Sequence, residues 1–133
     1  MRLLLDTHVL VHWDLDDPSI ASGAFTLIDT ALEEQGSVSC SIISLWEVAK
    51  LVELKRLSPR LSVDEWLADL EDHPQLEILP ITARIAVEST RLGPSFPRDP
   101  ADQLIAATAR CHGLHLLTSD GAIRKSGVVA LAE

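Results

Sequence analysis

The feature that most constrains the fold of this chain is a set of short, mainly apolar segments separated by longer segments with helical periodicity. Each short segment spans only four or five residues, which is too few for a typical helix. Strands with continuous rather than alternating apolar residues are typical of parallel sheets, which are covered by helices on both faces. The sequence therefore predicts an α/β fold with a small, mostly parallel sheet. The expected strands are 2–5, 37–40, 76–79, 114–118 and 128–131, and the expected helices are 7–14, 22–34, 43–55, 63–72, 82–91, 101–112 and 121–125.

Length and composition predict one domain over residues 1–133. A chain of 133 residues can bury one substantial core, and its 47% hydrophobic content is close to the average of soluble proteins. No apolar segment approaches the roughly 18 residues of a membrane helix, and the N-terminal apolar segment ends too early for a signal peptide. We therefore expect a cytoplasmic protein with no membrane contact. Cys40 and Cys111 lack metal-type spacing and are interpreted as reduced core residues.

The net charge argues against a nucleic-acid binder that depends on a basic surface. The formal charge is -9 at pH 7 and the pI is near 4.9, whereas phosphate contacts normally use a surplus of Lys and Arg. Any phosphate chemistry would therefore depend on bound cations. Solubility alone explains six of the acidic residues, namely Asp16, Asp17, Glu33, Glu34, Glu71 and Asp72.

Two aspartates stand where predicted strands end. Asp6 directly follows the first strand, and Asp120 follows the strand near the C-terminus. In open α/β sheets, ligands bind in the crevice beyond the carboxyl ends of the strands. Each aspartate could also simply cap the helix that follows it, and the two roles are compatible.

A glutamate interrupts the apolar stripe of the helix predicted at 43–55. Glu47 lies on the same helical row as Ile43 and Leu51. A carboxylate in apolar surroundings needs a cation, a hydrogen-bond donor or a proton. Lys50 is one candidate partner, although such a helical pair contributes only a few tenths of a kcal/mol.

The start of the helix predicted at 101–112 carries two more acids. Asp99 followed by Pro100 is a favourable N-cap and first-position pair, and Asp102 in the first turn suits the helix dipole. These local roles account for both acids without any role in binding or catalysis. Asp102 nevertheless shares a face with Ile105 and Ala109, which predicts that it points toward the sheet.

Four acids, with a fifth candidate, could therefore gather at one end of the sheet. Clustered carboxylates repel one another and raise one another's pKa unless a hard divalent cation offsets their charge. A ligand set of oxygens alone favours Mg²⁺ or Mn²⁺ over zinc. The four acids are Asp6, Glu47, Asp102 and Asp120, and the fifth candidate is Asp99.

The acids occur in four motifs whose order covers nearly the whole chain. The motifs are Leu3-Leu4-Leu5-Asp6-Thr7, Ser44-Leu-Trp-Glu47, Asp99-Pro-Ala-Asp102-Gln-Leu-Ile-Ala-Ala-Thr-Ala109 and Leu116-Leu-Thr-Ser-Asp120. In this order they resemble the motifs of PIN-domain ribonucleases, especially the toxins of type II toxin–antitoxin pairs of the VapC kind. Ser119 and Gly121, which flank the last acid, depart from residues common in the family.

The resemblance implies a three-layer sandwich with an acidic metal site. By this resemblance Asp6, Glu47, Asp102 and Asp120 are catalytic and bind metal, and either Asp99 or Asp102 touches the metal directly. The implied substrate-binding residues are Thr7 and Thr118, and Arg98 beside the site is our preferred phosphate contact.

The implied reaction is hydrolysis of an RNA phosphodiester by a water that one or two Mg²⁺ or Mn²⁺ ions activate. The resemblance also implies a cognate antitoxin protein as inhibitor and a homodimer as the assembly.

Histidine-based zinc chemistry is a competing interpretation. His8 and His12 are four residues apart on a predicted helix, but His112 and His115 lie on either side of Gly113, a helix stop, and do not share a face.

Other functional classes lack a residue that their chemistry requires. An aspartyl-phosphate phosphatase would need an acid two residues after Asp6, where His8 stands, and no dinucleotide-binding or P-loop motif occurs. A non-catalytic protein-binding module of the same fold remains an alternative, with Trp13, Trp46 and Trp66 as candidate anchors.

Overall fold

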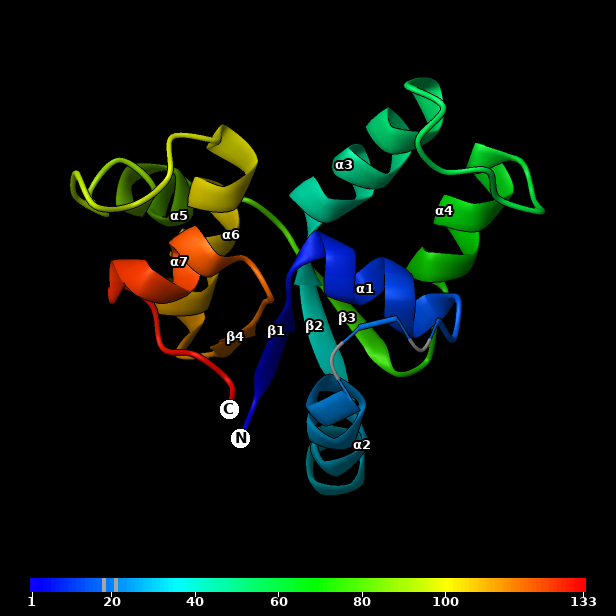
Figure 1. The fold of residues 1–133 in the computed structure, drawn as a ribbon, viewed down its shortest axis with the longest axis horizontal. Helices are drawn as coiled ribbons and strands as arrows, with labels where there is room; N and C mark the ends of the chain where they lie inside the picture. Colours follow the sequence, from blue (N-terminus) through cyan, green and yellow to red (C-terminus); the bar gives the residue numbers. More distant parts are fainter. Residues whose placement is uncertain (18, 21) are drawn as a thin grey trace.

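The computed structural model describes residues 1–17, 19–20 and 22–133. Within them, a parallel sheet has the strand order β3-β2-β1-β4 (Figure 1). The predicted α/β fold with a parallel sheet is therefore confirmed. The strands are β1 (Leu3–Leu5), β2 (Val38–Ser41), β3 (Leu76–Leu79) and β4 (His115–Leu117).

Helices cover both faces of the sheet because the side chains of each central strand alternate between two cores. Leu3 and Leu5 pack into one core with α1 to α4, while Leu4 faces the other core, which α6 and α7 cover. The three layers follow from this alternation. The helices are α1 (Thr7–Asp14), α2 (Ser22–Gln35), α3 (Ile42–Glu53), α4 (Val63–Glu71), α5 (Ala83–Glu88), α6 (Pro100–His112) and α7 (Gly121–Ser126). None of these helices is long and apolar enough to span a bilayer.

Two predicted elements differ from the structure. The segment 128–131 is not a strand of the sheet: after Gly127, whose φ of 70° ends α7, only Leu131 pairs, in an isolated bridge to Leu116. The helix predicted at 82–91 ends at Glu88, because the Ser89 and Thr90 hydroxyls donate to carbonyls three residues earlier and compete with further helical bonds.

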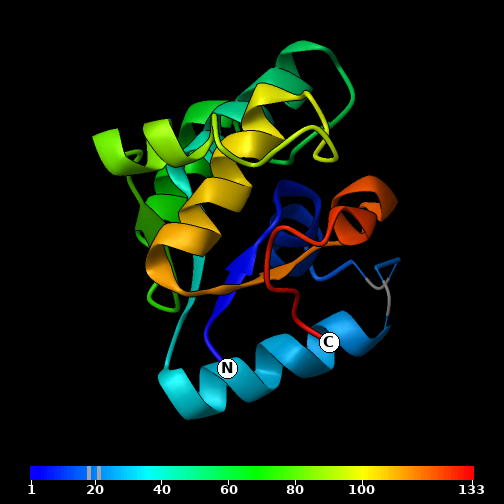
Figure 2. The ribbon, with the colours of Figure 1, turned by 90° about the vertical axis from the view of Figure 1, so that its left-hand side faces the viewer.

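The topology brings several segments of the chain to the carboxyl edge of the sheet. Leu5 of β1 is paired with Leu117 of β4, and the backbone N–H of Asp6 donates to the Leu117 carbonyl at 3.0 Å. Figure 2 shows α3 and the start of α6 toward this end of the strands, with α2 and both chain termini toward the other end. Residues far apart in the sequence can therefore meet beyond β1 and β4.

Candidate functional site

Asp6 lies at the centre of the site and both of its carboxylate oxygens are held. The residue is only 6% exposed. Oδ1 accepts the backbone N–H of Thr7 at 2.8 Å, which makes Asp6 the N-cap of α1. Oδ2 accepts the hydroxyl of Thr118 at 2.6 Å, across from the end of β4. Donors from two neighbouring strand ends therefore fix the orientation of this carboxylate.

Thr7 is the hydrogen-bond partner that Glu47 requires inside an apolar stripe. The Thr7 hydroxyl donates to Oε1 of Glu47 at 2.5 Å and lies 2.8 Å from the Ser44 hydroxyl. Lys50, the partner considered from the sequence, instead pairs with Glu53 at 2.6 Å. The glutamate is thus oriented from α1, forty positions away in the chain.

The pKa values show that the acids lie within electrostatic range of one another. Burial is the larger cause and the charges of neighbouring carboxylates are the smaller one, and together they raise the pKa of Asp102 to about 7. The neighbouring carboxylates belong to Asp6, Asp99, Glu47 and Asp120. Burial also raises the pKa of Glu47, which the hydrogen bond from Thr7 opposes, while the charges of Asp6 and Asp99 add to the increase. The structure therefore places the other four acidic candidates within electrostatic range of Asp102.

Asp99 and Asp120 have the capping role that the sequence allows. Oδ1 of Asp99 accepts backbone N–H groups of Ala101 at 2.8 Å and Asp102 at 3.5 Å, at the start of α6. Oδ1 of Asp120 accepts those of Ala122 and Ile123 at 2.9 and 3.0 Å, at the start of α7. Each cap uses one carboxylate oxygen, which leaves the second oxygen available as a ligand.

The donor set fits a hard divalent cation. Among the described residues, no ion pair involves any of the five acids, so their mutual repulsion is not offset by Lys or Arg. In the same part of the chain, no three His, Cys, Asp or Glu side chains are close enough to hold a metal ion as they stand. Without a cation, the negative charges of these carboxylates keep them apart. Ion binding would therefore require some of the carboxylates to move closer to one another.

The two predicted substrate-binding hydroxyls face the acids. Thr118 is 4% exposed, and besides donating to Asp6 its hydroxyl accepts the backbone N–H of Asp120 at 3.0 Å. Thr7 is buried with its hydroxyl directed to Glu47. Arg98, in contrast, is exposed in the loop directly before Asp99.

Sequence reasoning missed two residues that support the site. Ser44 is fully buried against Thr7, and its position three residues before Glu47 on one helical face was the available signal. Arg124, four residues after Asp120, donates to the Thr118 carbonyl at 3.2 Å and to the Glu133 carboxylate at 2.7 Å.

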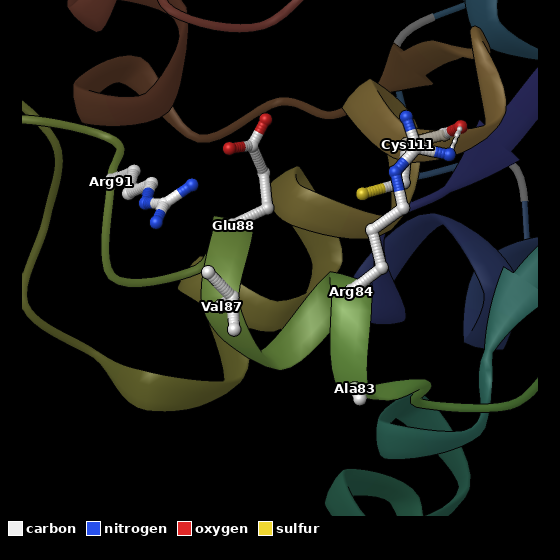
Figure 3. Close-up of a pocket in the computed structure, with 6 residues that line it drawn as sticks. All are labelled: Ala83, Arg84, Val87, Glu88, Arg91 and Cys111. Carbon is white, nitrogen blue, oxygen red and sulfur yellow. Dashed lines mark hydrogen bonds between the residues drawn. The ribbon is translucent and has the colours of Figure 1, made fainter.

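The cysteines are separate from the acids. Burial raises the pKa of the Cys40 thiol to about 12, in agreement with a reduced core residue. Cys111 is partly exposed rather than in the core, and it lines a cavity of about 360 Å³ beside α5. Figure 3 shows Arg84 reaching the Cys111 carbonyl there, with a distance of 3.4 Å between Nη1 and the oxygen. This cavity contains none of the predicted site residues.

Comparison with known proteins agrees with this fold. A family model described as the PIN domain matches residues 3–128. The chain is 35% identical over 122 residues to Ribonuclease VapC22 of Mycobacterium tuberculosis (strain ATCC 25618 / H37Rv), which covers 92% of this chain and 89% of that protein.

Solved structures show the same fold at lower sequence identity. FitAcB from Neisseria gonorrhoeae has a TM-score of 0.68 at 24% identity and covers 98% of this chain and 96% of that one. VapBC2 from Rickettsia felis, bound to a DNA fragment from its promoter, has a TM-score of 0.72 at 19% identity, with coverages of 99% and 98%. The match of the family model across nearly the whole chain, together with the relative at 35% identity, shows that this chain belongs to the PIN-domain family.

Proposed function

We propose that this chain, acting as a single domain in the cytoplasm, is a metal-dependent endoribonuclease and the toxin of a type II toxin–antitoxin pair. Its 35% identity to Ribonuclease VapC22 supports the ribonuclease class. The observation that carries the proposal is the convergence of five carboxylates, from four separate segments of the chain, with no ion pair to Lys or Arg among the described residues.

In this proposal the acids hold Mg²⁺ or Mn²⁺ at the carboxyl edge of the sheet. Asp6, Glu47, Asp102 and Asp120 are the proposed ligands and catalytic residues, and Asp99 either joins them or orients Asp102 from the start of α6. Bound at such a site, the ion supplies a water of lowered pKa and polarises the phosphoryl oxygen of the substrate.

The hydroxyls and the cations of the chain have supporting roles. Thr118 and Thr7 would keep Asp6 and Glu47 in place when the ion and the RNA bind, because both hydroxyls already donate to these carboxylates. Arg98, exposed next to Asp99, is the proposed phosphate contact. RNA binding to a chain of net charge -9 would require the divalent ion to offset repulsion between the acids and the phosphates.

A cognate antitoxin is the proposed protein partner, and a homodimer is the proposed assembly. The partner is suggested by the fold shared with VapBC2 and with a toxin–antitoxin complex from Klebsiella pneumoniae, which has a TM-score of 0.63. The alternative function is a non-catalytic protein-binding module of the same fold.

Incubation of the purified chain with total RNA tests the proposal. We expect cleavage in Mn²⁺, none in excess chelator, and discrete cut ends when the products are mapped. Asp6→Asn and Asp102→Asn should abolish cleavage, whereas Asp29→Asn, a matched substitution of an exposed acid on α2, should not. If the wild-type chain cleaves no RNA in Mn²⁺ but still binds its antitoxin, the binding-module alternative is correct.

A further inference from the structure

Trp46 is the tryptophan whose environment the core does not explain. It is 55% exposed on α3, one position before Glu47. Trp66 is 4% exposed and donates its Nε1–H to Asp14 at 2.7 Å, and Trp13 packs against the ring of His73. The structure therefore distinguishes Trp46 from the two tryptophans that have packing partners.

Trp46 lines a cavity that also contains two of the candidate ligands. The cavity has a volume of about 340 Å³ and lies between α3 and the start of α6. Glu47 and Asp99 line it together with Trp46, and the rest of its wall is formed by Lys50, Leu51, Pro100 and Ala101. A group bound against the indole ring would consequently lie directly beside the acidic cluster.

We infer that Trp46 forms a nucleobase subsite, in which an unpaired base of the RNA, adjacent to the phosphate that is cleaved, stacks on the indole ring. The inference rests on the proposed ribonuclease function and specifies how its substrate is held. Proteins recognise single-stranded RNA mainly by stacking splayed bases on aromatic side chains. Such stacking tolerates different bases because every base presents a π-face.

The charge of the chain favours this mode of binding over phosphate attraction. With a net charge of -9 and acids lining the cavity, the surface repels a phosphate backbone. Lys50, the cation at the cavity, pairs with Glu53 at 2.6 Å, which reduces the positive charge that it offers to RNA. Base stacking is independent of this repulsion, so it can bring the strand to the acids where ionic contacts alone would not.

Abasic substitution tests the subsite directly. A single-stranded oligonucleotide that spans the mapped cleavage site is prepared with an abasic nucleotide at each position around the cut in turn. We expect one abasic position to lower the kcat/KM of the wild type about 10-fold, mainly through KM. Trp46→Ala should show a similar loss on the intact oligonucleotide and little additional loss at that position. Trp46→Phe should retain most of the activity, and Leu54→Ala, a change at a residue 52% exposed beyond the end of α3, should behave like the wild type.

Fluorescence separates failure of the subsite from failure of the proposed function. In Asp102→Asn protein, RNA should quench tryptophan emission. Adding Trp46→Phe should remove most of the quenching, because Trp66 is buried and Trp13 is partly buried against the core. If quenching disappears with the abasic oligonucleotide but the wild type cleaves no RNA, the proposed catalysis is refuted and the nucleobase subsite is retained.

Equal sensitivity of wild type and Trp46→Ala to every abasic position would refute the subsite. A second outcome would also refute the subsite: Trp46→Ala loses activity, shows no effect specific to one abasic position, and has a changed oligomeric state in size-exclusion chromatography. Trp46 would then contact a second copy of the chain. Weaker antitoxin binding by Trp46→Ala, with unchanged RNA cleavage, would assign the cavity to the antitoxin instead.

Discussion

Replacing Asp102 with asparagine should stabilise the metal-free protein while it abolishes activity. The pKa of Asp102 is raised from the ordinary value of 3.8 to about 7, first by burial and then by neighbouring carboxylates. At pH values between 3.8 and about 7, Asp102 holds a proton in the folded chain that it has lost in the unfolded chain. The free energy of unfolding therefore decreases as pH rises from about 4 to about 7, and above that the full penalty remains.

The size of this penalty follows from the difference in proton affinity. At about 1.4 kcal/mol for each pH unit, the interval from 3.8 to about 7 corresponds to an upper limit of about 4 kcal/mol. Asp102 is only partly buried, so solvent screening reduces the penalty to about 1–2 kcal/mol. Asparagine removes the charge but also loses a favourable helix-dipole interaction of about 0.3–1 kcal/mol. We expect Asp102→Asn to gain about 1 kcal/mol at pH 8.

Urea unfolding in chelator at pH 5 and pH 8 measures this gain, with Asp29→Asn as the control. The gain should be smaller at pH 5, where Asp102 of the wild type is mostly protonated. Saturating Mn²⁺ should reverse the order of stability, because an ion at 100 times its Kd adds about 2.7 kcal/mol to the form that binds it. A variant that is less stable than wild type at pH 8 in chelator, or a gain that is the same at both pH values, would refute the reasoning.

Three further substitutions test individual contacts by urea unfolding. Thr118→Val removes the hydroxyl that donates to Asp6 at 2.6 Å, and it should lower the free energy of unfolding by about 1–3 kcal/mol. It should also lower Mn²⁺ affinity about 10- to 100-fold. An unchanged affinity would show that the hydroxyl does not orient the carboxylate. Asp99→Ala should lower the free energy of unfolding by about 0.5–2 kcal/mol because α6 loses its N-cap, and Asp99→Ser should recover that stability. If Asp99→Ser also recovers the Mn²⁺ affinity measured by calorimetry, Asp99 is not a metal ligand. Trp66→Phe should cost about 1–2 kcal/mol by leaving Asp14 without its indole donor. Asp14→Asn should also lose stability because the acceptor becomes neutral, and an unchanged stability in that variant would contradict a charge-assisted bond.

The parts of the fold that follow from local patterns were predictable from the sequence. The run Leu3–Leu5 has the continuous apolar character of a central parallel strand, and all three residues are buried. Asp99 before Pro100 marks the start of α6 by an ordinary capping rule, and the structure has the helix beginning at Pro100. The segment 128–131 has the composition of a strand, but composition does not show whether a segment pairs at one residue or at several, and here only Leu131 pairs.

The hydrogen bonds that organise the site could not be predicted, because they join residues distant in the sequence. Thr7 reaches Glu47 across 40 positions, and Thr118 reaches Asp6 across 112. Spacing rules identify residues on the same helical face or strand, whereas these bonds depend on which strands become neighbours. The order β3-β2-β1-β4 is a global property of the chain that local periodicity does not encode.

The capping roles explain how the fold tolerates so many acids at one edge of the sheet. Asp6, Asp99 and Asp120 each accept backbone N–H groups at a helix start, where the partial positive charge of the helix favours a carboxylate. Glu47 and Asp102, which cap no helix, have raised pKa values that reflect burial and repulsion. The capping acids are therefore stabilised by the fold itself, whereas Glu47 and Asp102 bear the electrostatic cost that a bound cation would relieve. On this reasoning, metal affinity depends most steeply on Glu47 and Asp102, and folding depends more on the three caps.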